Sequence, residues 1–94
     1  MIVSFKKDER TRMIFDGEKV QELDQKLYER ARRRLQVSDN APRIEDLYFP
    51  PSNKLHALGG YDPTRYAIRV NEQWRISFEW SEGKASEVLF EDYH

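Results

Sequence analysis

The residues of this chain best suited to chemistry are two histidines, one arginine, and an acidic and a phenolic side chain near its end. They are His56, Arg75, Asp92, Tyr93 and His94. A free imidazole titrates near neutral pH and exchanges protons readily, while a guanidinium stays charged and engages two phosphate oxygens at once. Attack of a ribose 2′-hydroxyl on the adjacent phosphorus needs a base, an acid and a cation that offsets the developing charge. The set therefore predicts acid–base chemistry on RNA, with Tyr93 donating a hydrogen bond or stacking on a base.

Each of these residues also has a simpler interpretation. A loop histidine such as His56 is often a surface or capping residue, Arg75 could form only a cross-strand ion pair, and a terminal histidine is normally free in solvent. Two histidines and Asp92 could supply three zinc ligands, but no motif with metal-ligand spacing supports such a site. Cysteine is absent, which excludes thiolate metal sites and disulfides. We therefore expect no metal and no other cofactor.

Positive charge is concentrated in one segment, although 16 Lys and Arg nearly balance 17 Asp and Glu over the whole chain. Two acids stand between residues 26 and 43, together with six basic residues: Lys26, Arg30, Arg32, Arg33, Arg34 and Arg43. The uneven distribution is compatible with one face that meets RNA. The alternative is the ordinary solvated side of a helix.

The first half of the chain predicts helices behind one short strand. Ile2–Phe5 is an apolar run typical of a strand, and Asp16-Gly17 indicates a turn. A helical stripe of apolar residues then follows, at Val20, Leu23, Leu27, Ala31 and Leu35, and Ser38-Asp39-Asn40 ends it. A second, short helix is predicted from Ala41-Pro42, capped by Asn40, with Ile44, Leu47 and Tyr48 before Pro50-Pro51.

The second half alternates with a period of two, which predicts strands. Residues 66–70 and 74–80 form a hairpin around Asn71-Glu72-Gln73, and residues 86–90 form a further strand after a turn at Ser81–Gly83. The fold class is therefore α+β, with the N-terminal strand and helices packed on an antiparallel-rich sheet. We expect Trp74, Ile76, Phe78 and Trp80 to face the helices. Arg75 and Arg69 then share the opposite, open face of the sheet.

Length and hydropathy indicate the setting of the domain. Ninety-four residues predict a single domain over residues 1–94. The opening MIVSFKKDERTRM has no apolar run long enough for a signal peptide or a membrane span. We expect a cytoplasmic protein with no membrane partner.

Three stretches of the chain resemble a known family. PPSNKLHALGG, YAIRVNEQWRISFEW and the final EDYH resemble the HigB-type toxins, or plasmid-maintenance killer proteins, of the RelE/ParE superfamily. RVNEQWRISF and DYH are the most specific parts, and the resemblance covers essentially the whole chain. It implies a fold like that of microbial RNases. It also implies a toxin of a type II toxin–antitoxin system that cleaves mRNA in the ribosomal A site and so inhibits translation.

The resemblance also implies partners. They are the ribosome with its mRNA, and a cognate HigA-like helix-turn-helix antitoxin, commonly two toxins with two antitoxins. Operator DNA is reached only through the antitoxin. Two alternatives remain open: a ParE-like inhibitor of DNA gyrase that hydrolyses nothing, and a catalytically degenerate protein that only binds its antitoxin.

The family's functional residues match this sequence unevenly. Its terminal Asp-Tyr-His falls on residues 92–94, its strand arginine on Arg75 and its loop histidine on His56. Some members carry a lysine shortly after that histidine, where this chain has Gly59. Either another basic residue takes its place or activity is lower. We expect the phosphate- and RNA-binding residues to be Lys54, Arg69, Arg30, Arg33 and Arg34.

Overall fold

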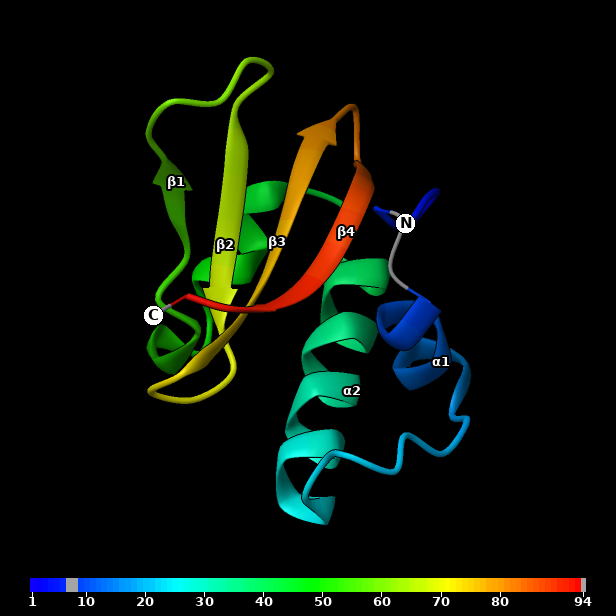
Figure 1. Cartoon of the computed structure of the whole chain (residues 1–94). Helices are drawn as coiled ribbons and strands as arrows, with labels where there is room; N and C mark the ends of the chain where they lie inside the picture. Colours follow the sequence, from blue (N-terminus) through cyan, green and yellow to red (C-terminus); the bar gives the residue numbers. More distant parts are fainter. Residues whose placement is uncertain (7–8, 94) are drawn as a thin grey trace.

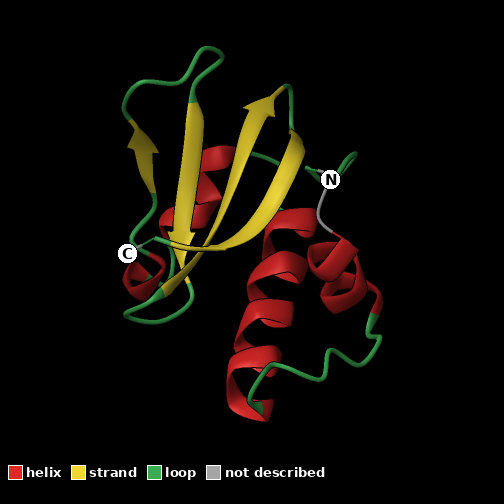
Figure 2. Cartoon of the chain, viewed as in Figure 1, coloured by secondary structure: helices red, strands yellow, loops and turns green. Residues whose placement is uncertain are grey.

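The computed structural model describes residues 1–6 and 9–93, which form two helices and a four-stranded antiparallel sheet in the order β1-β2-β3-β4 (Figure 1). The elements are α1 (Glu9–Asp16), α2 (Gln25–Asn40), the 3₁₀ helices η1 (Ile44–Tyr48) and η2 (Pro51–Asn53), β1 (His56–Leu58), β2 (Arg65–Arg69), β3 (Trp74–Ser81) and β4 (Lys84–Asp92). Figure 2 shows the helices on one side of the sheet. The predicted α+β class is confirmed.

The hairpin of β2 and β3 forms as predicted, to within one residue at each end. Its turn begins at Asn71, whose side-chain Oδ1 accepts hydrogen bonds from the backbone N–H groups of Gln73 and Trp74, both at 2.8 Å. Such an Asx turn supplies locally the chain reversal that the short polar connection indicates.

The two faces of β3 also follow the prediction. Ile76 and Phe78 are fully buried in the core that α1 and α2 cover, and Trp74 packs against that core. Residues opposite each other on paired strands share a face, and Arg69 lies opposite Arg75. Both arginines are therefore on the side of the sheet away from the core.

The strand β4 contains an irregularity that changes its pairing with β3. Glu82 and Gly83 both have positive φ in the tight turn that joins the two strands. Past this turn, the register shifts by one residue beside Glu87, which also has a left-handed conformation (φ 50°). This β-bulge places Glu91, rather than its neighbour Phe90, opposite Arg75.

The prediction of a strand over Ile2–Phe5 is wrong, because these residues form no continuous strand. Ile2 and Phe5 instead form two isolated parallel bridges to β4, opposite Ala85 and Val88. The bulge between those two positions interrupts the edge of β4, and there the Ser4 hydroxyl accepts a hydrogen bond from the backbone N–H of Glu87 at 2.9 Å. A regular ladder cannot continue through that point.

The helices depart from the sequence prediction at their starts. The helix α2 begins at Gln25 rather than Val20, because the Asp24 carboxylate accepts a hydrogen bond from the Leu27 N–H and caps the first turn. Val20 is buried in the core but precedes the helix. The helix α1 was not predicted from the sequence, and it buries Thr11 and Ile14.

The segment between α2 and the sheet also needs correction. Asn40 is the last residue of α2 and no cap for a second helix, and η1 begins only at Ile44. After η2, Lys54 has a left-handed conformation (φ 48°) that turns the chain toward β1. The segment around His56 was expected to be a loop, but it forms this short edge strand against β2.

Candidate active site

A hollow of about 210 Å³ lies where the start of β1, the end of β2, the start of β3 and the end of the chain come together. In Figure 1 the described chain past β4 comes near the segment that leads into β1. The hollow is lined by Lys54, His56, Arg69, Arg75 and Tyr93. All five are residues for which the sequence predicted a role in the site. We refer to this feature as the hollow.

His56 is exposed and held through one ring nitrogen. Its Nδ1 lies 2.8 Å from the backbone carbonyl oxygen of Lys54. Because a carbonyl oxygen only accepts hydrogen bonds, Nδ1 carries the proton in this contact. In the neutral ring, Nε2 then keeps its lone pair, as a general base requires.

The guanidinium of Arg75 is hydrogen-bonded at its Nε but, in the described part of the chain, not at its terminal nitrogens. Its Nε donates to Glu91 Oε2 at 2.9 Å, and its guanidinium lies 5.6 Å from the centre of the Tyr93 ring. Within residues 1–6 and 9–93, neither terminal nitrogen of Arg75 has a hydrogen-bond partner. The cross-strand ion pair considered from the sequence therefore exists, and it leaves part of the fork available to an anion.

Tyr93 is positioned by the β2–β3 turn. Its hydroxyl donates to the carbonyl oxygen of Asn71 at 3.1 Å, and its backbone N–H donates to the carbonyl of Gln73 at 3.1 Å. Asp92 lies opposite Trp74, one position beyond the Arg75 pair, and its carboxylate accepts a hydrogen bond from Gln73 Nε2 at 2.8 Å. Asp92 is not among the residues that line the hollow. His94 lies outside the described residues.

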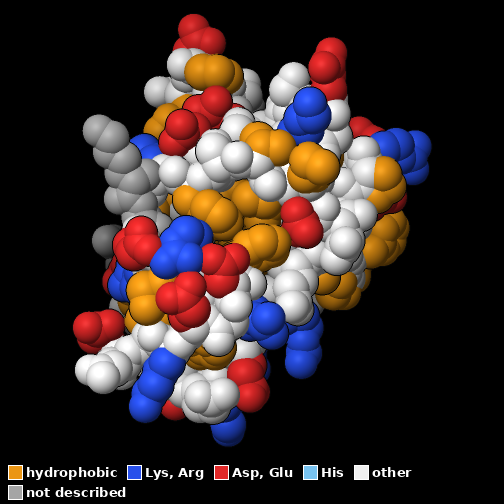
Figure 3. All heavy atoms as spheres, turned by 90° about the vertical axis from the view of Figure 1, so that its right-hand side faces the viewer, with side chains coloured by type: hydrophobic (Ala, Val, Ile, Leu, Met, Phe, Trp, Pro, Cys, Tyr) orange, Lys and Arg blue, Asp and Glu red, His pale blue; other side chains and the backbone are white. Residues whose placement is uncertain are grey.

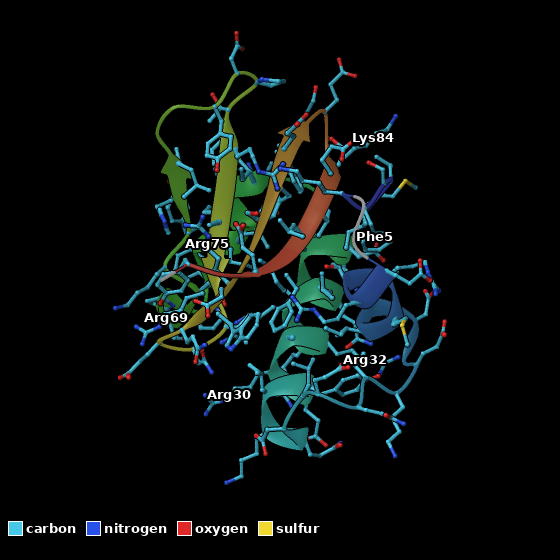
Figure 4. The ribbon with its side chains drawn as sticks, in the orientation of Figure 1. Phe5, Arg30, Arg32, Arg69, Arg75 and Lys84 are labelled. Carbon is cyan, nitrogen blue, oxygen red and sulfur yellow. The ribbon has the colours of Figure 1, made fainter. Side chains whose placement is uncertain are left out.

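A larger basic groove, of about 870 Å³, adjoins the hollow. Its basic lining residues are Arg30, Arg33, Arg34, Lys54 and Arg69, the predicted RNA-binding set. Lys54 and Arg69 line both the groove and the hollow. Arg34 joins the helix to the sheet, because its Nε donates to the carbonyl oxygen of Arg69 at 3.1 Å. Figure 4 shows Arg30 on the side of α2 toward Arg69, and Arg32 on the side toward α1.

Basic residues outnumber acids in the lining of the groove, where Glu72 is the acid that lies beside the five basic residues. Burial, and then the positive charges of Arg33 and Arg30, lower the pKa of Arg34. In the part of the chain that the structure describes, none of these three arginines has a carboxylate oxygen within 4.0 Å. An arginine remains charged at neutral pH even with a lowered pKa. The groove therefore presents concentrated positive charge to an anionic ligand.

The opposite arrangement is found on the side that carries α1. There Arg12 forms ion pairs with Glu9, Asp16 and Glu18. The hydrogen bonds that Arg12 donates to these carboxylates, first to Glu9, raise the pKa of Arg12. Figure 3 shows basic and acidic side chains interleaved on this side of the molecule. The charge of Arg12 is therefore matched within the protein itself.

Two residues support the site in ways that were not predicted from the sequence. Glu91 orients Arg75, and Asn71 organises the turn that holds Tyr93. The position of Asn71 could have been recognised from the sequence, because an Asn that opens a short polar connection between two strands is typical of an Asx turn. The role of Glu91 could not, because its pairing with Arg75 depends on the bulge in β4.

Neither a metal cluster nor a membrane helix is found in the described parts of the chain. Residues 1–6 and 9–93 contain no group of three or more His, Cys, Asp or Glu side chains placed to hold a metal ion. None of the helices in those residues combines the length and the apolar content needed to cross a bilayer.

The comparisons with known proteins agree on one family. The sequence pattern of the family described as "RelE-like toxin of type II toxin-antitoxin system HigB" matches residues 3–94. An endoribonuclease HigB of Proteus vulgaris is 33% identical over 94 residues, which is the full length of both chains. Toxin HigB-1 of Vibrio cholerae is 40% identical over 53 residues, and that match spans 56% of each protein. An uncharacterized protein of Haemophilus influenzae is 29% identical over 89 residues, or 95% of this chain and 88% of its own.

The family match covers both the hollow and the groove. It includes every residue that lines either of them, and it includes the helices that place the arginines. The resemblance predicted from the histidine loop, the Trp-Arg-Ile strand and the terminal residues is confirmed. This chain belongs to the HigB-like family of RelE-like toxins of type II toxin–antitoxin systems.

Proposed function

We propose that this chain is an endoribonuclease that cleaves mRNA in the A site of the translating ribosome and thereby inhibits translation. The observation that carries the proposal is the junction between the hollow and the basic groove, where Lys54 and Arg69 line both. A strand of RNA that follows the groove reaches His56 and Arg75 without leaving the positively charged surface. The name of the full-length Proteus vulgaris relative supports the same activity.

The chemistry follows from the geometry of the hollow. His56 Nε2 takes the proton of the ribose 2′-hydroxyl, and the oxygen attacks the adjacent phosphorus. The open side of the Arg75 fork, with Lys54 and Arg69, stabilises the negative charge on the phosphorane oxygens. The bond to the 5′-oxygen breaks, and that oxygen takes a proton. The products are a 2′,3′-cyclic phosphate and a free 5′-hydroxyl.

The proton for the leaving oxygen comes, in this proposal, from the terminal Asp-Tyr-His segment. Tyr93 lines the hollow, while the roles of Asp92 and His94 are carried over from the family resemblance. Deleting His94 tests this assignment, since general acid–base groups contribute about a hundredfold to ten-thousandfold in rate. We expect a folded protein that binds antitoxin and no longer arrests growth. Cleavage within a few-fold of the parent would remove His94 from the mechanism.

The ribosome contributes positioning. The hollow offers a single described histidine and few acid–base groups, so holding the mRNA in a reactive geometry accounts for a large share of the rate. Purified protein should barely cut naked RNA but should cut mRNA on a programmed ribosome. Equal rates with and without ribosomes would contradict this part of the proposal.

The partner that keeps the toxin inactive is a cognate HigA-like antitoxin with a helix-turn-helix domain, in a complex of two toxins and two antitoxins. Membership of a type II toxin–antitoxin family supports an antitoxin. Operator DNA is then bound only through that partner. Co-expression with the protein encoded beside it should restore growth, and light scattering of the purified complex gives the stoichiometry.

A further inference from the structure

Among the described residues, three hydrogen bonds join the turn between β2 and β3 to Asp92 and Tyr93. The Tyr93 hydroxyl donates to the Asn71 carbonyl, and the Tyr93 N–H donates to the Gln73 carbonyl, both at 3.1 Å. The Gln73 side chain donates from Nε2 to Asp92 Oδ2 at 2.8 Å. Residues at a chain end fray unless such contacts tie them down, and Tyr93 lies beyond the last residue of β4.

One side-chain oxygen makes two hydrogen bonds to the backbone of this turn. Asn71 Oδ1 accepts from the N–H groups of Gln73 and Trp74, both at 2.8 Å. The Asn71 N–H in turn donates to the Trp74 carbonyl at 3.2 Å. Both side-chain bonds use an acceptor, so aspartate at position 71 preserves them whereas alanine removes both. The position of the two carbonyls that hold Tyr93 therefore depends on this oxygen.

The turn also connects the two parts of the site. Asn71 and Gln73 form part of the wall of the basic groove, while Tyr93 lines the hollow beneath the Arg75 guanidinium. One short segment thus sets the distance between the surface that holds RNA and the residues that act on it. A displacement of about 1 Å at a reacting group costs up to roughly a hundredfold in rate.

We propose that Asn71 and Gln73 are positioning residues, which hold Asp92 and Tyr93 in the geometry that cleavage requires. The catalytic part of this inference rests on the proposed ribonuclease function. Neither residue needs to touch the reacting atoms. Their effect is transmitted through the backbone carbonyls and the Gln73 amide described above.

The test compares Asn71→Ala, Asn71→Asp and Gln73→Ala with the parent on programmed ribosomes. We expect Asn71→Ala to lower kcat by about tenfold to a hundredfold with KM within about twofold, because the groove arginines are unchanged. Asn71→Asp should recover most of the rate, and Gln73→Ala should show a smaller loss of kcat. The matched control is Asp24→Ala, which removes a comparable side-chain bond to the backbone at the start of α2 and should leave kcat unchanged.

A second measurement reads the same contacts without relying on activity. Hydrogen exchange of the Tyr93 amide should be faster in Asn71→Ala than in the parent, and close to the parent rate in Asn71→Asp and Asp24→Ala. If the parent itself fails to cleave RNA, the proposed function is wrong, and this exchange still decides whether the turn holds Tyr93. Unchanged exchange in Asn71→Ala, or a kcat within twofold of an active parent, would overturn the inference.

Discussion

Two arginines on the outer face of the sheet, one toward each end of it, are used in opposite ways. Arg65, at the start of β2, is 4% exposed, and its Nη2 donates to the Ser77 hydroxyl at 2.9 Å and to the Glu87 carbonyl at 2.8 Å. Its Nη1 lies 3.8 Å from Glu79 Oε2. Among residues 1–6 and 9–93, Arg75, at the start of β3, is paired only along its Nε edge, with Glu91.

The difference teaches how to separate a structural arginine from one that awaits a ligand. Both terminal nitrogens of Arg65 are engaged by the protein, so its charge and donors stabilise the bulged region of β4. Arg75 instead lines a hollow that His56 also lines. The same distinction separates Arg12, which is surrounded by carboxylates, from Arg34, whose neighbours are positive. Residue type alone does not make this distinction.

Replacing Arg75 should have the largest effect on activity. We expect Arg75→Ala to reduce single-turnover cleavage on programmed ribosomes by about a hundredfold to a thousandfold, because a preorganised donor to the transition state is lost. Arg75→Lys keeps the charge but not the fork and should lie in between. The melting temperature should change little, since the Glu91 pair is partly exposed. If Arg75→Ala cleaves within a few-fold of the parent rate, Arg75 has a structural role like that of Arg65 and no role in cleavage.

Replacing Arg65 should act on stability instead. Arg65→Ala leaves the buried Ser77 hydroxyl and the Glu87 carbonyl without this donor and opens a cavity, which together cost about 3 kcal/mol. For a domain of this size, that loss lowers the melting temperature by roughly 10 °C or more. Measurements by thermal and urea denaturation should agree. If the variant melts like the parent but cleaves poorly, Arg65 belongs to the site and the comparison fails.

The smallest expected effect concerns the groove arginines. Replacing Arg30 and Arg33 together with glutamate should weaken ribosome binding and flatten its dependence on salt. Each lost phosphate contact reduces the slope of log affinity against log salt by about 0.7 to 0.9. Melting temperature should be nearly unchanged because both side chains are exposed.

Lys84→Glu is the charge control for the groove variant, since Lys84 lies at the other end of the sheet from Arg69 (Figure 4). It should leave both affinity and slope unaltered. Because Lys84→Glu changes half as much charge as the double variant, a loss half as large would mean that overall charge, and not the groove, guides binding.

The sequence was sufficient for the hairpin of β2 and β3 and for the choice of its buried face. Alternation in Trp74–Trp80 predicted which side of β3 meets the helices, because a half-buried strand records its burial in every second residue. The Asn71 turn and the apolar stripe of α2 are likewise local patterns. The histidine loop and terminal residues were recognisable as site candidates, and the structure places His56, Arg75 and Tyr93 around one hollow.

Only the tertiary structure decided the pairing that completes this site. Continued from the tight turn at Glu82-Gly83 without interruption, the register of β3 and β4 would place Phe90 opposite Arg75; the bulge at Glu87 shifts the pairing to Glu91. The bulge coincides with contacts that the strand sequence does not contain: the Ser4 hydroxyl to the Glu87 N–H, and Arg65 to the Glu87 carbonyl. Ser4 and Arg65 are distant from β4 in the sequence. The pattern of residues within β4 therefore cannot reveal these contacts. The register of Arg75, and with it the open side of its guanidinium, is therefore a property of the folded chain.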